Sequence, residues 1–330
     1  MNKKNEIRKM LFSHLTDDQI DLFYKVYNKI FHRGDLMKKI KCGNDNSDIV
    51  FFVIRPRKDC VEGLLSLFWN VMINIEYANK KGYVPIVDFK NYETQYWMGN
   101  DSNAWEFYFT QPTKYKLENV YRSKNVILSG LETLQYNKEK YRANYDRKSL
   151  FEMYSTIFSS ISFSDEVLKR VEKEMGNLDF SNVIGLYLRG TDYTNLKPSG
   201  HPVQPSVKQA EEVVDMYIEK YHPKFLFLVT EDGKIYEEIK QRYGDLCRTV
   251  SFDKYVYNYD GKQFLSHDKS IMELCESPYE RGMNYLTKIV MLSRCGYIIG
   301  GNTNGMWAAC AFSGGKCKDY YIFDLGTYGK

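Results

Sequence analysis

The sequence contains neither a long apolar run nor a pattern of paired cysteines. No window comes near the roughly 18 uninterrupted apolar residues of a membrane-spanning helix. The charged N-terminus leads into an amphipathic stretch instead of the apolar centre of a signal peptide. The seven cysteines are scattered and form no C-x-x-C pair and no zinc-ligand spacing, which is typical of reduced thiols in a cytosolic protein. We therefore expect a cytoplasmic protein without an integral membrane segment.

The net charge is also small, and the common catalytic motifs are absent. A formal charge of +4 over 330 residues is too small and too dispersed for the basic stripe of a nucleic-acid-binding protein, so we expect no nucleic-acid partner. The absence of G-x-G-x-x-G and G-x-x-x-x-G-K-[ST] disfavours dinucleotide redox chemistry and P-loop chemistry. Neither H-E-x-x-H nor the G-x-S-x-G elbow of serine hydrolases occurs. No acidic metal pocket is indicated, and we expect neither a metal nor another cofactor.

Apolar and amphipathic segments alternate along the rest of the chain. In the first half, the apolar runs 48–54 and 84–89 predict strands on either side of a helix at 64–81, and 123–130 predicts a third strand. A strand–helix–strand unit of this kind builds a parallel sheet. Helical periodicity over 3–32 predicts two leading helices.

The second half repeats this alternation with more strands. Strands are predicted at 183–189, 224–232, 246–252 and 318–326, and 296–305 predicts a strand followed by a turn. The intervening helices are predicted at 205–222, 234–245, 279–295 and 306–315. Five strands interleaved with helices are typical of a Rossmann-like domain. At roughly 150 residues per domain, we expect an α/β protein of two such domains, 1–160 and 161–330, with the ligand in the cleft between them.

The first strand of the second half ends in four residues that favour anion binding. Arg189 is always charged and can fork onto two oxygens, while Gly190 lets a ligand approach the backbone. Thr191 supplies a hydroxyl, and Asp192 can anchor Arg189, cap the next turn or accept a proton. The alternative is an ordinary strand-end salt bridge between Arg189 and Asp192.

Two further strand ends carry polar residues. Glu231 and Asp232 can hold ribose or base donors, or they can cap the helix that follows. The third strand end is followed by a turn into a helix. This turn can expose backbone amides to an anion, or it can simply cap the helix. It consists of Asn302, Thr303, Asn304 and Gly305. Because the carboxyl ends of parallel strands share one edge of a sheet, the conjunction favours a nucleotide site over three unrelated caps.

These segments resemble a known enzyme family. LYLRGTDY followed by His201-Pro202, then FLVTED, then LSRCGYIIGGNTNGMWAACA, is similar to the three-motif signature of GDP-fucose-dependent fucosyltransferases. The similarity covers roughly 183–312 and is nearest to the α-1,6 class, with kinship to the α-1,2 and protein O-fucosyltransferases. It implies a GT-B fold, with two facing Rossmann-like domains, 1–160 on the acceptor side and 161–330 on the nucleotide-sugar side, and no required metal.

The resemblance also implies roles for single residues. Arg189 corresponds to the arginine that binds the diphosphate and stabilises the leaving group, and His201 to the histidine beside the nucleotide. Thr230, with Glu231 and Asp232, aligns with the segment that meets guanosine. The turn 302–305 matches the serine-rich turn that faces the phosphates, and the N-terminal domain approaches the donor with Gly63 and Asn70.

One position departs from the α-1,6 pattern. The glutamate that serves as base in that class is replaced by Lys197, and lysine is charged at neutral pH unless strongly desolvated. We expect Lys197 to assist the leaving group. Either the base lies elsewhere, at Asp192 or at an N-terminal carboxylate such as Asp88, or the acceptor and the chemistry differ from those of the class. The aromatic segment 91–112 predicts a binding loop, whose rings either stack on an acceptor sugar or simply pack the loop, among them Tyr92, Trp97 and Trp105.

The function that follows is inverting transfer of fucose from GDP-fucose to a glycan hydroxyl in bacterial surface polysaccharide or glycoconjugate synthesis. The expected partners are a nucleotide sugar and a glycan acceptor, and a lipid-linked acceptor is compatible with this reading. Two alternatives stay open: a transferase that uses another nucleotide sugar, and a non-catalytic nucleotide- or glycan-binding protein.

Overall fold

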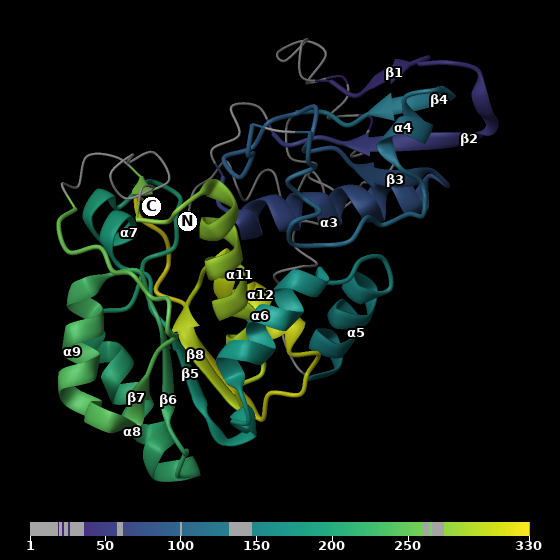
Figure 1. The fold of residues 1–330 in the computed structure, drawn as a ribbon. Helices are drawn as coiled ribbons and strands as arrows, with labels where there is room; N and C mark the ends of the chain where they lie inside the picture. The colour runs from purple at the N-terminus through teal and green to yellow at the C-terminus, as the bar shows by residue number, and fades with distance from the viewer. Residues whose placement is uncertain are drawn as a thin grey trace. The chain divides into compact units, whose positions relative to one another are not determined.

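The computed structural model describes residues 36–57, 62–99, 101–131, 147–259, 264–265 and 274–329, together with Gln19, Leu22 and Val26. Apart from those three residues, the helices predicted over 3–32 lie outside the described residues. The chain divides into two compact units. The first comprises Met1–Ala143 with Ser159–Ser162, and the second Asn144–Phe158 with Phe163–Lys330. Each unit contains a sheet of its own (Figure 1).

The first unit is built around a four-stranded sheet with the order β1-β4-β2-β3. Its strands are β1 (Lys38–Ile40), β2 (Asp45–Ile54), β3 (Val84–Val87) and β4 (Ser123–Leu128). β2 pairs in parallel with both β3 and β4, whereas β1 is antiparallel to β4. The three parallel strands confirm those predicted from the apolar runs. β1 could not be predicted, because three residues that include two lysines show no alternation.

The helices of the first unit are α3 (Leu64–Lys80), which confirms the predicted helix, and the short α4 (Leu117–Val120). Alternate residues of β2 point to opposite faces of the sheet. Phe51 and Val53 join a buried cluster with residues of β3, β4 and α4. On the other face, Phe52 lies 5.5 Å, between ring centroids, from Tyr77 of α3. Burial on both faces explains why β2 ends in a continuous apolar run.

The second unit has a five-stranded sheet in the order β7-β6-β5-β8-β9, and every neighbouring pair is parallel. Its strands are β5 (Ile184–Tyr187), β6 (Leu226–Val229), β7 (Cys247–Arg248), β8 (Tyr297–Gly301) and β9 (Asp319–Phe323). Its helices are α5 (Arg147–Phe158), α6 (Asp165–Met175), α7 (Thr191–Leu196), α8 (Val207–Tyr221), α9 (Gly233–Tyr243), α11 (Pro278–Ser293) and α12 (Asn304–Phe312). The predicted strands and helices of this half are confirmed, except that the strand predicted over 246–252 is reduced to the two residues of β7, and α7 occupies a segment predicted as loop.

Helices cover both faces of this sheet. Ile184, Leu186 and Leu188 enter a core shared with residues of α8 and α9. On the opposite face Gly185 lies against α11, where a Cβ would come within 2.4 Å of Leu292 Cδ1. Figure 1 shows α8 and α9 on one side of the strands and α11 with α12 on the other. The second unit therefore has the doubly wound arrangement of a Rossmann-like domain.

Side-chain caps fix where the helices of the second unit begin. An oxygen of the preceding residue accepts a hydrogen bond from a backbone N–H in the first turn of α6, α8, α9, α11 and α12. The capping residues are Ser164, Ser206, Asp232, Ser277 and Thr303. Small polar residues are the preferred caps because they satisfy N–H groups that the helix leaves unpaired.

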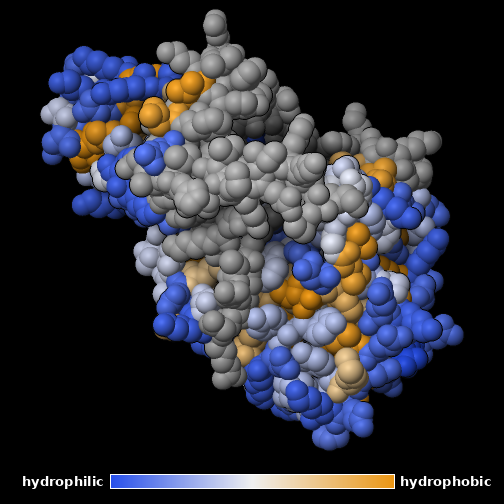
Figure 2. All heavy atoms as spheres, turned by 180° about the vertical axis from the view of Figure 1, so that it is seen from behind, coloured by the Kyte–Doolittle hydropathy of each residue, from blue (hydrophilic) through white to orange (hydrophobic). Residues whose placement is uncertain are grey.

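Some apolar side chains are exposed on the surface of the second unit. Figure 2 shows small apolar groups between hydrophilic residues on the second unit. Met216 of α8 is 55% exposed and Tyr257, in the segment after β7, is 47% exposed. Separate apolar residues of this kind are ordinary on protein surfaces. Within the described ranges, no helix combines the length and the apolar character needed to cross a membrane.

Candidate functional site

The carboxyl ends of β5, β6 and β8 meet at one edge of the sheet in the second unit. Tyr187 at the end of β5 pairs with Val229 on one side and with Gly300 on the other, so the residues that follow leave the sheet at the same level. The strand order reverses at β5, with β6 and β7 to one side and β8 and β9 to the other. In open parallel sheets, ligands bind outside the carboxyl ends at such a switch point.

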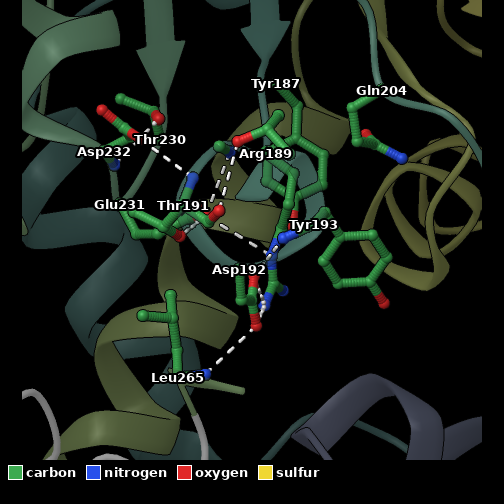
Figure 3. Close-up of polar contacts among 12 residues, drawn as sticks. Tyr187, Arg189, Thr191, Asp192, Tyr193, Gln204, Thr230, Glu231, Asp232 and Leu265 are labelled. Carbon is green, nitrogen blue, oxygen red and sulfur yellow. Dashed lines mark hydrogen bonds and ion pairs between the residues drawn. The ribbon is translucent and has the colours of Figure 1, made fainter. Parts of the chain in front are cut away.

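Arg189 lies at this edge and is held by two carboxylates. Its Nη2 donates to Oδ1 and Oδ2 of Asp192 at 3.3 and 3.2 Å, and its Nε lies 3.4 Å from Oε1 of Glu231. Its guanidinium carbon lies 4.8 Å from the ring centroid of Tyr193 (Figure 3). The side chain keeps 26% of its surface exposed. A fixed guanidinium is thus available to an anion.

The carboxylates also secure the charge of Arg189. Burial alone would lower the pKa of the guanidinium, but the negative charges of Glu231 and Asp192 outweigh this effect and raise the pKa well above its ordinary value. Burial in turn raises the pKa of Glu231, an effect that the charge of Arg189 opposes. The arginine is therefore a permanent cation whose orientation is set by its neighbours.

Glu231 and Asp232 hold the turn that carries Arg189. Oε1 of Glu231 accepts from the N–H of Gly190 and the hydroxyl of Thr191, both at 3.2 Å. Oδ2 of Asp232 accepts from the N–H of Thr191 at 2.9 Å, while Oδ1 caps α9. Thr191 has φ +42°, a left-handed conformation that β-branched residues rarely adopt. Such strain persists where the surroundings impose it, and here the two carboxylates do so.

The place of each predicted residue at β6 follows from these bonds. Thr230 is buried, and its hydroxyl accepts from the N–H of Asp232 at 3.1 Å. The carboxylates of Glu231 and Asp232 accept hydrogen bonds from the turn that carries Arg189. The carboxylate of Asp232 also accepts from the first turn of α9. In the structure they position Arg189, and the predicted contact of this segment with guanosine stays a prediction.

Gly190 provides a direct test of the arginine turn. A Cβ at this position would lie 2.4 Å from Oδ2 and 2.7 Å from Cβ of Asp232, and Asp232 cannot retreat without uncapping α9. We expect Gly190→Ala to displace the turn and to lower the free energy of unfolding by about 1–3 kcal/mol, the usual cost of overpacking. Urea unfolding measures this effect, and an unchanged midpoint would show that the contact between the turn and Asp232 is loose.

The ring of His201 contacts Tyr193, the residue whose ring also contacts the guanidinium of Arg189. Its ring centroid is 5.4 Å from that of Tyr193 and 5.8 Å from that of Phe264. Its carbonyl accepts from the N–H of Tyr328 at 2.9 Å, which ties this segment to the end of the chain. Burial lowers the pKa of His201, the positive charge of Arg189 lowers it further, and Asp192 partly opposes both effects.

A pH dependence follows from the lowered pKa of His201. As pH falls below about 6.5, the unfolded chain binds the proton before the folded protein does, so stability that is present above this pH is lost. We expect the free energy of unfolding of the wild type to fall relative to His201→Gln between pH 7.5 and 5, by at most about 1.4 kcal/mol per pH unit. Chemical unfolding at each pH measures the difference, and His222→Asn, which replaces an exposed histidine, is the control. Parallel curves for wild type and His201→Gln would contradict the expectation.

The turn from β8 into α12 lies beside the arginine strand. Thr303 Oγ accepts from a backbone N–H of the first turn at 3.1 Å, and Oδ1 of Asn302 accepts from an indole N–H of α12 at 2.7 Å. Gly305 is enclosed, because a Cβ would lie 2.5 Å from the hydroxyl of Tyr285 and 2.8 Å from the ring of Tyr187. The first turn of α12, which includes Asn304, has the positive end of the helix dipole.

Asp192 and Lys197 differ sharply in their surroundings. Asp192 is 1% exposed and, besides Arg189, accepts from the N–H groups of Tyr193 and Leu265 at 2.9 and 3.2 Å (Figure 3). Lys197 is exposed and ends α7 with φ +45°. Asp192 thus has the geometry of an anchor for Arg189. Proton transfer by Asp192 and assistance by Lys197 stay predictions.

In the first unit, the side chains of Asp88 and Trp105 are buried and contact other residues of the protein. Asp88 is fully buried, and its carboxylate accepts from the side chain of Asn91 at 2.9 Å and from the hydroxyl of Tyr121 at 2.6 Å. Trp105 is 1% exposed and stacks on Phe109 with ring centroids 4.6 Å apart. The predicted acceptor contacts are not supported for either side chain, because neither presents a surface to a ligand. Core packing explains the aromatic letters at Trp105 instead.

The other predicted residues of this unit keep features that suit ligand contact. Gly63 caps α3, and a Cβ there would meet nothing within 4 Å. Asn70 is 5% exposed, and its Oδ1 has no hydrogen-bond partner among the described residues. The Nε1 of Trp97 is buried and equally unpaired within them. Buried polar atoms without partners call for an explanation such as a ligand or water. Tyr92 contacts Arg55, whose guanidinium carbon lies 5.1 Å from the ring centroid.

The structure also brings forward residues that the sequence did not single out. Tyr193 supports Arg189, and Tyr285 faces Tyr187 with their hydroxyl oxygens 3.3 Å apart. Neither contact could be found from the sequence, because Tyr193 lies in a segment predicted as loop and Tyr285 is 98 residues from Tyr187. In the part of the chain that is described, no three His, Cys, Asp or Glu side chains gather in a way that could hold a metal ion.

Comparison with known proteins yields matches to solved structures alone. No family model matches the chain, and no curated protein matches it. Fucosyltransferase NodZ from Bradyrhizobium is 17% identical over 79% of this chain and 92% of its own, with a TM-score of 0.45. NodZ α-1,6-fucosyltransferase soaked with GDP-fucose is 17% identical over 85% of this chain and 97% of its own, with a TM-score of 0.48. POFUT1 in complex with GDP is 12% identical over 83% of this chain and 74% of its own, with a TM-score of 0.37.

At these identities and TM-scores, the similarity carries no statement about the activity of this chain. What the chain does chemically has to follow from its own residues.

Proposed function

We propose that the protein is a glycosyltransferase that moves fucose from GDP-fucose to a glycan hydroxyl, in the synthesis of a bacterial surface polysaccharide or glycoconjugate. The observation that carries the proposal is Arg189, a permanent cation that Asp192 and Glu231 fix at the switch point of a Rossmann-like sheet. A guanidinium in this position suits a diphosphate, because its N–H groups can donate to two oxygens at once. The motif resemblance supports guanosine as the base and fucose as the sugar.

The reaction we propose proceeds with inversion. The acceptor hydroxyl oxygen bonds to the anomeric carbon while the bond from that carbon to the β-phosphate oxygen breaks, and a base removes the hydroxyl proton. GDP leaves with the bonding electrons, and its growing negative charge is met by Arg189 and by the first turn of α12. Removing one such fixed donor typically costs a factor of about 10²–10³ in rate.

The position of the base can be narrowed by geometry. An inverting displacement places the base and the leaving group on opposite faces of the sugar. Asp192 and Glu231 both contact the guanidinium that would meet the departing diphosphate, so they lie on the leaving-group side. We therefore propose that the base is a carboxylate outside the Arg189 cluster.

The proposed reaction requires no metal. Arg189 and the positive end of α12 supply charge at the point where a divalent cation would otherwise neutralise the diphosphate. Turnover should then be the same with and without EDTA.

The experiment that tests the function is donor turnover. The full chain is incubated with bacterial surface glycans and, in separate reactions, GDP-fucose, GDP-mannose or UDP-galactose, and products are analysed by mass spectrometry. We expect release of GDP and addition of one deoxyhexose with GDP-fucose only. Transfer from another donor would replace fucose in the proposal, and GDP binding without any transfer would favour a non-catalytic binding protein.

A further inference from the structure

The sheet of the first unit has its own row of polar residues at the carboxyl edge. Arg55, Asp88 and Ser129 directly follow β2, β3 and β4. The register brings them to one level, since Ile54 pairs with Val87 and Val53 with Leu128. The strand order reverses at β2, with β3 on one side and β4 on the other. Arg55 therefore leaves the sheet at a switch point, the part of such sheets where ligands bind.

Arg55 is fixed, although no carboxylate pairs with it in the described ranges. Its backbone N–H donates to the hydroxyl of Ser129 at 2.9 Å, and its Nε donates to the carbonyl of Ser129 at 3.0 Å, with Nη2 donating to the same oxygen. Its guanidinium lies over the ring of Tyr92. These contacts leave the Nη1 end unengaged by any described residue, on a side chain that is only partly buried.

No described carboxylate contacts this cation directly, although Asp88 follows the neighbouring strand at the same edge of the sheet. The carboxylate of Asp88 is occupied by Tyr121, by Asn91 and by two backbone N–H groups. Glu62 is engaged by a different arginine, Arg57. Because the guanidinium is held through Nε and Nη2 by a carbonyl, its Nη1 end stays available to an anionic ligand.

Arg55 and Arg189 have similar surroundings in their two units, with one difference. In each, an arginine just beyond the switch strand lies over a tyrosine ring, at 5.1 Å for Arg55 and 4.8 Å for Arg189. Arg189 is flanked by two carboxylates, which limit the net positive charge of its surroundings. No described carboxylate contacts Arg55, whose guanidinium is held by the carbonyl of Ser129 instead.

We propose that Arg55 binds an anionic group of the acceptor, a carboxylate or a phosphate, with Tyr92 as its aromatic support. The inference rests on the proposed function, which makes the ligand of the first unit the acceptor. A guanidinium donates two parallel hydrogen bonds to either group, and an aromatic ring beside it suits the apolar face of a sugar. The acceptor is accordingly an acidic or phosphorylated glycan.

The test measures affinity for three small sugars by ligand-observed NMR on the full chain, with saturating GDP present to occupy the second unit. The sugars are methyl β-glucuronide, methyl β-glucoside and glucose 1-phosphate. We expect the wild type to bind at least one of the charged sugars roughly tenfold or more tightly than the neutral glucoside, as charge-assisted hydrogen bonds allow. Whichever of the two charged sugars binds better identifies the group as carboxylate or phosphate.

Two variants assign the preference to Arg55. Arg55→Met should bring the ratio of charged to neutral affinities to about one, and Arg55→Lys should keep part of it. Arg122→Met is the matched control, because this exposed arginine precedes β4 at the opposite edge of the same sheet, and the variant should retain the wild-type ratio. Thermal unfolding confirms that each variant is folded.

Several results would overturn the proposal. The wild type could show no preference for charged sugars, or it could bind none of the three sugars. The preference could also survive in Arg55→Met. Weaker GDP binding in Arg55→Met would mean that Arg55 serves the donor, which also overturns the assignment. Failure of GDP to shift the melting temperature would instead count against the proposed function, and the sugar ratio would still report on Arg55.

Discussion

Arg189→Lys should lower the turnover of GDP-fucose by about 10²–10³-fold while the protein stays folded. Lysine keeps a positive charge between Asp192 and Glu231, so no buried carboxylate is left without a cation. It cannot donate through a planar fork, however, and the stabilisation of a departing diphosphate depends on that geometry. Steady-state kinetics with GDP-fucose, together with the thermal midpoint, measure both parts of this expectation.

Arg189→Ala should behave differently, because it removes the cation altogether. Asp192 is 1% exposed, and a buried carboxylate that loses its partner typically destabilises a protein by about 3–5 kcal/mol. We expect loss of activity together with a large fall in the unfolding midpoint. Arg242→Lys is the matched control, since Arg242 is a half-exposed arginine of α9 paired with Asp215. Near-wild-type turnover in Arg189→Lys would remove Arg189 from the catalytic machinery.

Asp192→Asn should weaken GDP binding by roughly tenfold or more and lower activity in proportion. The carboxylate accepts from Arg189, Tyr193 and Leu265, and a neutral amide offers one acceptor oxygen and no charge. Hydrogen bonds to charged groups contribute about 1.5–3 kcal/mol each, so the turn should also lose stability. Calorimetric titration of GDP and steady-state kinetics give the two quantities.

The ratio of these two effects separates an anchor from a base. An anchor affects Arg189 in the ground state, so affinity for GDP and turnover fall together. A base acts only on the acceptor proton, so Asp192→Asn would then abolish turnover and leave GDP affinity unchanged. Asp215→Asn, at a partly exposed residue of α8 in the same unit, controls for the loss of one surface charge.

The sheets could be predicted from the sequence because strands that are buried on both faces consist of continuous apolar residues. β2 and β5 are covered on both faces, so nearly every letter in their buried parts is apolar, and the helices between strands keep a helical period. Once the strands are placed, parallel pairing brings Arg189, Glu231 and Asn302 to one edge. That the three strand ends meet therefore follows from topology alone.

The partners of these residues could not be predicted in the same way. Glu231 and Asp232 are compatible with ribose contacts, with helix capping and with the clamp on Thr191, and the clamp becomes visible only once β5 is paired with β6. Aromatic residues pack a core as readily as they stack on a sugar, so the sequence leaves both roles open for Trp105. Arg55 stood in a segment with the composition of a turn, and its role depends on Ser129, 74 residues away.

Nucleotide selectivity is the measurement that tests the central claim most directly. The melting temperature of the full chain is compared with GDP, UDP, CMP and NAD, each with and without EDTA. The account predicts stabilisation by GDP alone, equal in both conditions, and of about 2.7 kcal/mol at a concentration one hundred times the dissociation constant. Preference for another nucleotide, dependence on a metal, or no stabilisation by any of the four would contradict it.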